Sequence, residues 1–214
     1  MFMPCAHGVA TSASQQRLEH LIAERLKPGA DKKAIDDRIW DLLGERWAVM
    51  CTDLSGFSRR VAEFGIIHFI QTIYESLRIF TPCLDRHDGI LLKIEADSLL
   101  VIFRKADSAL DCAIAMQRAT REYNRGRPPE DHVLLCAGLG WGDMLRVGDA
   151  DVFGAEVNAA SKLGEDIAKG GEILVTEQFR GALDAHAGLE FERLAEAPSG
   201  ARAAFRCRYP EGAS

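Results

Sequence analysis

Two aspartates are the residues in this sequence whose type and placement could do chemistry together. Asp53 ends the apolar run WAVMCT, and Asp97 lies in the tight turn of GILLKIEADSLLVIF, which has the pattern of a β-hairpin. If the hairpin lies beside the first strand, the two carboxylates meet at one edge of the sheet and repel each other unless a cation bridges them. Mg²⁺ favours one or two carboxylates together with phosphate oxygens. The pair therefore indicates a metal site, although a single aspartate after a strand is more often a turn former or a helix N-cap.

The turn that follows Asp53 could hold the phosphate that such a metal needs. Leu54–Ser58, in CTDLSGFS, contains a glycine and precedes a helical pattern, so its free backbone N–H groups form an anion site. Together with the two aspartates, this turn indicates a site for a metal–nucleoside triphosphate complex. The sequence contains none of the motifs HExxH, GxSxG or GxxxxGK(S/T).

The elements that must position these residues alternate between strands and helices. The patterns predict a buried strand from Trp47, a helix over 57–87, the hairpin over 89–103, a helix over 106–124, a strand over 132–141, an irregular glycine-rich segment over 142–156, a short helix over 156–170, a strand running into a helix over 171–179, and closing strands over 189–196 and 203–210. This order predicts an α/β (α+β) fold of the ferredoxin-like βαββαβ type. We expect a partly antiparallel sheet with helices packed on one side of it.

Residues 1–45 are predicted to form an N-terminal tail and a helical extension, ahead of a domain over 46–210. RLEHLIAERL and KKAIDDRIWDLLG both have helical periodicity, with Asp31 as a cap for the second helix and Gly44 at its end. The apolar side of that helix includes Trp40. Two interpretations stay open: these helices pack on their own domain, or they bind a partner or a second copy.

The composition is that of a globular protein without a membrane span. Of the 214 residues, 47% are hydrophobic and 27% charged, and the net charge is −6. This acidic balance argues against binding to nucleic acid or anionic membranes. No apolar run approaches the ~20 residues that span a bilayer, and the N-terminus lacks a signal-peptide pattern. The six cysteines form no CxxC pair and lie mostly in apolar runs, as expected for reduced thiols of a cytoplasmic protein.

In three of its segments the sequence resembles the catalytic domain of the class III nucleotidyl cyclases, over roughly 47–209. CTDLSGFS resembles the family's first metal-aspartate turn, and KIEADSLLVIF resembles its hairpin, with a lysine four residues before the second metal aspartate. DVFGAEVNAASKL resembles the segment that contacts the ribose and the transition state. Each motif alone is weak, but their order and spacing together favour the family's fold.

The resemblance implies a role for each matching residue in the conversion of ATP to 3′,5′-cyclic AMP and pyrophosphate. Asp53 and Asp97, assisted by the Leu54 carbonyl, would bind two Mg²⁺ or Mn²⁺ ions, one activating the ribose 3′-hydroxyl and one steadying the triphosphate. The other implied roles are phosphate binding by Gly56, Phe57 and Ser58, orientation of the ribose by Asn158, stabilisation of charge on the α-phosphate by Lys162, and recognition of the base by Lys93 and Asp151.

The resemblance also implies the base and the assembly. Lys93 can donate to the ring nitrogens of adenine and Asp151 can accept from its amino group, whereas guanine-selective members have Glu and Cys at these positions. In the family, the metal aspartates come from one subunit, and the base and transition-state residues come from the other. A single chain with both sets implies a symmetric homodimer with two sites. The implied partners are ATP and a second copy, with no nucleic acid, and the N-terminal helices leave room for an unknown regulatory partner.

Three positions depart from the family's pattern. Lys162 replaces an arginine and so keeps the charge without the planar fork. Ala96 replaces a glycine, which would strain the hairpin tip if the position needs a positive φ. In EAPSGARAA, where the family often has a phosphate-binding lysine, the nearest cation is Arg202.

These departures keep a second interpretation open, namely a cyclase-like domain that binds nucleotide or dimerises without useful turnover. A metal-dependent phosphohydrolase is disfavoured, since no additional histidine or aspartate ligands accompany the pair. A nucleic-acid polymerase is disfavoured, since there is no basic track for a template.

Overall fold

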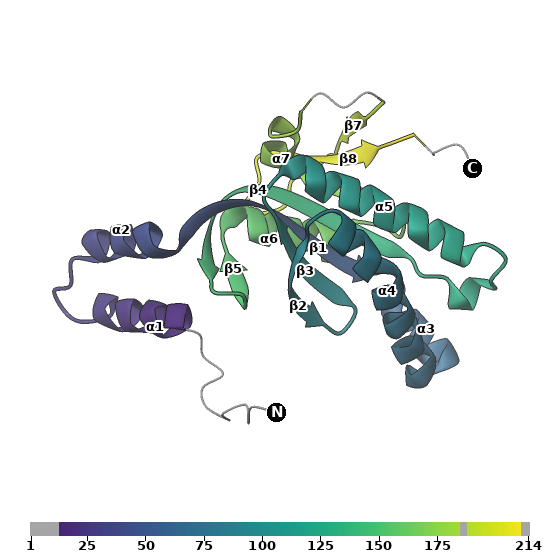
Figure 1. The fold of residues 1–214 in the computed structure, drawn as a ribbon, viewed down its shortest axis with the longest axis horizontal. Helices are drawn as coiled ribbons and strands as arrows, with labels where there is room; N and C mark the ends of the chain where they lie inside the picture. Colours follow the sequence, from purple (N-terminus) through teal and green to yellow (C-terminus); the bar gives the residue numbers. More distant parts are fainter. Residues whose placement is uncertain (1–12, 185–187, 211–214) are drawn as a thin grey trace, which may run out of the picture.

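An eight-stranded mixed sheet forms the centre of the computed structural model, which describes residues 13–184 and 188–210, with residues 57–60 described by their backbone alone (Figure 1). The predicted tail over residues 1–12 lies outside the described residues. The strands are β1 (Gly44–Leu54), β2 (Ile90–Glu95), β3 (Ser98–Phe103), β4 (Leu135–Val147), β5 (Asp151–Phe153), β6 (Ile173–Thr176), β7 (Glu190–Arg193) and β8 (Ala204–Arg208).

The sheet order is β2-β3-β1-β4-β6-β8-β7, with β5 paired to β4. Strand β1 runs antiparallel to both of its neighbours, β3 and β4, whereas β4 and β6 are parallel. The β2–β3 hairpin lies beside β1, as the sequence predicts. The α+β fold with a partly antiparallel sheet is therefore confirmed.

Helices pack on both faces of the sheet. They are α1 (Ala13–Arg25), α2 (Lys32–Leu43), α3 (Phe57–Phe64), α4 (Ile66–Arg86), α5 (Ala106–Asn124), the 3₁₀ turn η1 (Pro129–Asp131), α6 (Ala155–Ser161), the π-helix η2 (Lys162–Ile167) and α7 (Glu177–Gly181). On β1, Ala48 and Met50 join the core beneath α4 and α5, whereas Val49 and Cys51 face the other way and pack with Val157 of α6. The expectation that helices cover one side only is wrong, since α6 and η2 cover part of the opposite face.

Glycines explain how α6 and η2 come so close to the sheet. A Cβ on Gly138 of β4 would lie 2.1 Å from the carbonyl oxygen of Ala160, and one on Gly164 would lie 2.4 Å from that of Cys51. Both distances are far below van der Waals contact, so the two backbones can meet only where these positions carry no side chain. This close packing fixes η2 directly over the end of β1.

Two predicted segments differ from the structure. The helix expected over 57–87 is divided into α3 and α4 at Gly65, whose φ of 85° favours glycine and interrupts the helical hydrogen bonding. The segment expected to be irregular over 142–156 instead continues β4 to Val147 and then forms β5. Its many glycines and polar residues weaken the strand pattern in the sequence, although alternate residues of the two strands still pack in the interior.

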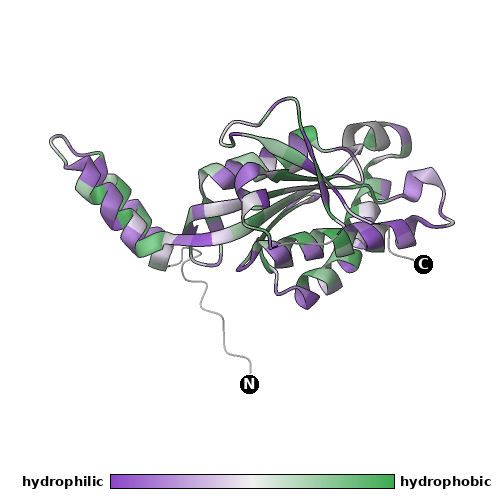
Figure 2. Ribbon diagram, turned by 90° about the horizontal axis from the view of Figure 1, so that it is seen from above, coloured by the Kyte–Doolittle hydropathy of each residue, from purple (hydrophilic) through white to green (hydrophobic). Residues whose placement is uncertain are grey.

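Helices α1 and α2 form a hairpin that projects from the start of β1, at Gly44 (Figures 1 and 2). Its own small core contains Leu21, Ile35, Ile39 and Leu43, with Leu145 of β4 packed against it. Asp31 caps α2 by accepting from the Ala34 amide, as predicted, and Gly44 is the C-cap.

The hairpin therefore packs on the domain at its base. It still leaves the Trp40 side chain 46% exposed, and both interpretations of these helices stay open. The division into an extension over 1–45 and a domain over 46–210 likewise stays a prediction. Among the helices described, none is both long and apolar enough to cross a bilayer.

Candidate active site

The two predicted metal aspartates lie next to each other at one edge of the sheet. Thr52 of β1 is paired with Leu99 of β3, which places Asp53 beside the turn that carries Asp97. Burial and then the neighbouring carboxylate of Asp97 raise the pKa of Asp53 to about 6. Burial also raises the pKa of Asp97, although backbone N–H groups partly oppose this effect. Two carboxylates with raised pKa values at one point favour the arrival of a positive charge.

The chemistry of this pair fits a hard divalent cation. Oδ2 of Asp97 is buried and accepts no hydrogen bond from the described residues, which is unfavourable for a carboxylate oxygen. Within residues 13–184 and 188–210, no group of three or more His, Cys, Asp and Glu side chains is arranged to hold a metal. The site therefore offers two carboxylates from the protein and leaves the remaining positions to a ligand, a pattern typical of Mg²⁺ bound with phosphate.

The turn after Asp53 presents backbone N–H groups. Gly56 has a φ of 93° and is the N-cap of α3, and the Ser55 amide is tied to the carbonyl of Leu134. Phe57 and Ser58 form the first turn of α3, and their side chains lie outside the described part of the chain. Leu54 is buried in β1. The left-handed glycine lets the chain turn from strand to helix directly beside the carboxylates, where the helix N-terminus can meet an anion.

The two predicted base-recognition residues are in contact. The Lys93 ammonium of β2 donates to Oδ2 of Asp151 in β5 at 2.5 Å, and it also lies 3.8 Å from a carboxylate oxygen of Glu95. The bond to Asp151 is the main cause that raises the pKa of Lys93. Residues 58 positions apart in the sequence are thus brought together across two hairpins.

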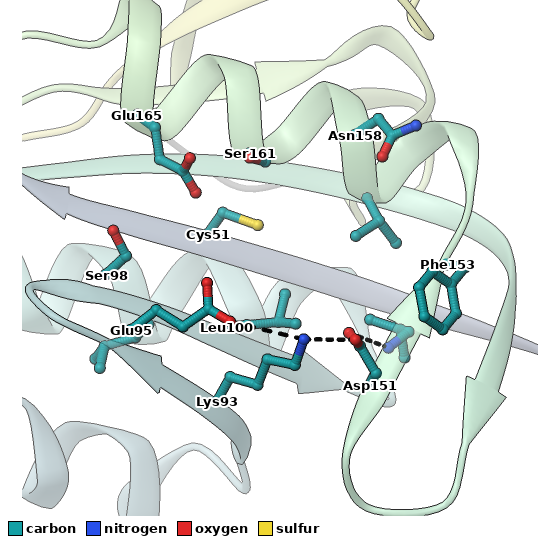
Figure 3. A pocket seen from close by; sticks show the side chains of 13 residues that line it. Cys51, Lys93, Glu95, Ser98, Leu100, Asp151, Phe153, Asn158, Ser161 and Glu165 are labelled. Carbon is teal, nitrogen blue, oxygen red and sulfur yellow. Dashed lines mark hydrogen bonds and ion pairs between the residues drawn. The ribbon is translucent and has the colours of Figure 1, made fainter. Parts of the chain in front are cut away.

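A cavity of about 250 Å³ links this ion pair to α6 (Figure 3). Asn158 of α6 lines it, together with Ser161 and Glu165, and Cys51 of β1 lies at its floor. The cavity reaches Ser98, the residue after Asp97. The structure therefore brings Lys93, Asp151 and Asn158 to one cavity and places the carboxylate pair beside its end.

Lys162 does not line this cavity. Its ammonium instead donates to the Ser199 hydroxyl at 2.5 Å, in the loop between β7 and β8 that also contains the exposed Arg202. The loop is seated on α6 through Gly200, whose φ is 105° and where a Cβ would lie 2.7 Å from the carbonyl oxygen of Ala155. Lys162 thus follows Asn158 on the helix but points elsewhere.

Ala96 has a φ of 53°. The backbone at this position is in the left-handed region, so the alanine is strained, as expected for a residue in the place of a glycine. Asp97, the next residue, is nevertheless held at the hairpin tip next to Asp53.

Sequence reasoning missed Ser161, Glu165 and Phe153, which also line the cavity. Ser161 and Glu165 follow Asn158 by three and seven residues, a spacing that places them on one side of a helix and could have identified them. The π-helical turn and the glycine contact that seat Glu165 over β1 leave no comparable signal in the sequence.

Comparisons with known proteins agree with the architecture. No family model matches the chain. A protein of Rhizobium meliloti (strain 1021) named "Putative adenylate cyclase 3" is 27% identical over 144 residues, 67% of this chain. The serine/threonine-protein kinase pkn2 of Myxococcus xanthus is 29% identical over 129 residues, 60% of this chain. The matched regions are only 24% and 15% of these proteins' own lengths.

Solved structures of cyclases have the same fold. The adenylate/guanylate cyclase/hydrolase from Silicibacter pomeroyi superposes with a TM-score of 0.65 at 24% identity, covering 77% of this chain and 95% of that one. The adenylyl cyclase CyaB from P. aeruginosa gives 0.64 at 17% identity, covering 79% and 97%. The guanylyl cyclase Cya2 gives 0.57 at 20% identity, covering 77% and 90%. The resemblance to class III cyclase catalytic domains is confirmed at the level of the fold, and both adenylyl and guanylyl cyclases share it.

Proposed function

We propose that this protein is an adenylate cyclase that converts ATP to 3′,5′-cyclic AMP and pyrophosphate at the interface of a homodimer. The observation that supports this proposal most is that one chain with a cyclase-type fold carries both half-sites. One half-site is the Asp53–Asp97 carboxylate pair, and the other is the cavity lined by Lys93, Asp151 and Asn158.

In this proposal Asp53 and Asp97 hold two Mg²⁺ or Mn²⁺ ions, with the Leu54 carbonyl assisting. When bound, such ions supply Lewis-acid activation of a hydroxyl and neutralisation of phosphate charge. The backbone of Gly56, Phe57 and Ser58 binds the terminal phosphates at the start of α3. The reaction forms a bond between the ribose 3′-oxygen and the α-phosphorus and breaks the bond from that phosphorus to the bridging oxygen, so that pyrophosphate and the hydroxyl proton leave.

The second half-site orients the nucleoside. Asn158, exposed at the cavity, positions the ribose by hydrogen bonding, and Lys162 meets the charge that builds on the α-phosphate. Lys162 must first turn away from Ser199 to do so. For adenine, Asp151 accepts from the amino group while Lys93 donates to a ring nitrogen. The Lys93–Asp151 contact keeps both groups ordered in the cavity before a base arrives.

Assembly as a homodimer completes each site. The two half-sites of one chain would each face the other half-site on a second copy, since a two-fold interface presents each surface twice. The exposed Trp40 and the α1–α2 hairpin are where a regulatory partner could bind. We place the activity in the cytoplasm, since the five cysteines described are free thiols, as in a reducing compartment.

The test is product formation by the purified protein. ATP, GTP, CTP and UTP are supplied separately with Mg²⁺ and then with Mn²⁺, beside the variant Asp53→Ala. The proposal predicts cyclic AMP from the wild type and none from the variant. Faster turnover of GTP or of a pyrimidine nucleotide would contradict the base assignment.

A second candidate function is a nucleotide-binding or dimerising module with little turnover. Two observations favour it: Lys162 is bonded to Ser199, and Ala96 has a strained backbone. In this case the folded, dimeric wild type would bind ATP without forming a cyclic product. The variant Lys162→Arg separates the two functions, because a planar fork that can grip phosphate oxygens should raise product formation only if the site is otherwise competent.

A further inference from the structure

We propose that Glu165 is a third carboxylate of the metal half-site, which increases the affinity of Asp53 and Asp97 for divalent cations through its charge. It acts from outside the set of direct ligands. This inference rests on the proposed metal-dependent function.

The packing of η2 places Glu165 close to the two aspartates. Gly164 is pressed against the carbonyl of Cys51, two residues before Asp53 on the same face of β1. Glu165 follows immediately, and its carboxylate points into the cavity toward Cys51 and Ser98 (Figure 3). The side chain therefore lies over the end of β1, near the two aspartates.

The electrostatics agree with this placement. Partial burial is the main cause that raises the pKa of Glu165, and the Ser161 hydroxyl opposes it. The carboxylates of Asp166, of Glu95 and then of Asp97 each add to the rise. Glu165 in turn is one of the groups that raise the pKa of Asp53. A third like charge costs free energy in the empty site and is compensated only when positive charge arrives. No arrangement of three direct ligands exists among the described residues, so Glu165 acts at longer range.

The neighbouring residue Asp166 provides a matched control. Both side chains are exposed on the π-helix, but Asp166, one position further on, does not line the cavity. Glu165→Gln and Asp166→Asn each remove one negative charge and keep nearly the same size. A general effect of protein charge would change both variants equally, whereas a specific effect would appear in Glu165→Gln alone.

The experiment measures Mn²⁺ binding without nucleotide, from the loss of the free-Mn²⁺ electron paramagnetic resonance signal. Wild type, Glu165→Gln, Asp166→Asn and Asp53→Asn are compared in the full chain at neutral pH. We expect Glu165→Gln to weaken Mn²⁺ binding about three- to tenfold and Asp166→Asn to change it less than about twofold. Glu165→Asp, which keeps the charge on a shorter side chain, should give an intermediate affinity.

A second readout comes from thermal unfolding without metal. There Glu165→Gln should melt at or above the wild-type temperature, because a like charge has been removed. A variant that melts lower and binds Mn²⁺ like the wild type would overturn the proposal, as would equal losses in Glu165→Gln and Asp166→Asn.

Failure of the underlying function looks different. If Asp53→Asn binds Mn²⁺ as tightly as wild type, or if wild type binds none, the metal half-site itself is wrong and the inference falls with it. If Asp53→Asn loses binding and Glu165→Gln does not, only the role of Glu165 is wrong.

Discussion

The proposed metal half-site and the proposed base half-site of this chain have opposite electrostatic arrangements. At the first, Asp53 and Asp97 bring like charges together, the pKa of Asp53 rises to about 6, and one oxygen of Asp97 is buried without a partner. At the second, Lys93 and Asp151 bring opposite charges together and satisfy each other. One half-site is unfavourable until a cation binds, and the other is already satisfied and must exchange its internal bond for bonds to a ligand.

Because of this difference, one half-site can supply affinity for the metal and the other can supply selectivity for the base. The carboxylate pair gains free energy from any suitable cation, and so it can supply binding strength. The ion pair gains only from a base that replaces both of its bonds, because a mismatched base leaves a half-buried lysine or aspartate unpaired. Variants of the first half-site should therefore change metal binding and rate, and variants of the second should change the choice of nucleotide.

The largest effect is expected at the carboxylate pair. Asp97→Asn should lower cyclic product formation by at least about 100-fold, because it removes one of two charged ligands. Its metal-free stability should stay at or above the wild-type value, since a like charge is lost. Initial rates and thermal melting measure the two effects, with Asp166→Asn as the control of equal charge. If Asp97→Asn is inactive because it unfolds, the expected contrast between lost activity and retained stability is contradicted.

The next effect is a change of base preference. In the double variant Lys93→Glu/Asp151→Cys, the lysine donor becomes an acceptor and the aspartate acceptor is replaced by a thiol, which suits guanine better than adenine. The ratio of kcat/KM for ATP to that for GTP should fall by at least about tenfold. Metal affinity should stay within about twofold. A double variant that loses both nucleotides equally would mean that these residues support the cavity without reading the base.

A pH dependence is expected from Asp53. Its ordinary pKa of 3.8 rises to about 6 in the folded chain, so between these values the folded state holds a proton that the unfolded state has released. Metal-free wild type should therefore lose stability relative to Asp53→Asn as the pH rises from about 4 to about 6. Mn²⁺ affinity should fall as the pH drops below about 6, because the ion competes with that proton. A stability difference between the two proteins that does not vary with pH would contradict the raised pKa.

The smallest effect concerns the hairpin tip. Ala96→Gly should stabilise the protein by about 0.5–1 kcal/mol, because glycine accepts the left-handed backbone while costing some entropy of the unfolded chain. Ala150→Gly, in the exposed turn between β4 and β5 where φ is not positive, should instead be neutral or destabilising. Denaturant unfolding measures both. Equal changes in the two variants would remove the argument from backbone strain.

Much of this arrangement could be predicted from the sequence. Asp53 and Asp97 were predictable because Asp53 ends an apolar run and Asp97 lies in the turn of a hairpin, and strand pairing then brings them together. Lys93 and Asp151 were identified by the resemblance, but their contact joins β2 to β5, which are not paired in the sheet, so strand pairing alone could not predict it. Positive φ at Ala96 was anticipated as the condition under which this alanine would be strained.

Other features depend on tertiary packing. The placement of α6 and η2 on the second face needs Gly138 and Gly164 opposite each other. These glycines are 26 residues apart, and no local sequence pattern indicates that they meet. The hydrogen bond from Lys162 to Ser199 joins segments 37 residues apart. The four-residue spacing from Asn158 to Lys162 is that of one helical face and gives no sign of this contact. The turn at Gly65 depends on a backbone angle that an apolar periodicity does not report.

The central claim is that each site takes its metal carboxylates from one copy and its nucleoside residues from another. The most direct measurement is cyclic AMP formation by an equimolar mixture of Asp53→Ala and Asn158→Ala, allowed to exchange subunits. Each variant alone should be inactive. The mixture should recover roughly a quarter of the wild-type rate, because half of the dimers are mixed and each of these contains one intact site of two. A mixture that forms mixed dimers and stays as inactive as its components would contradict the account.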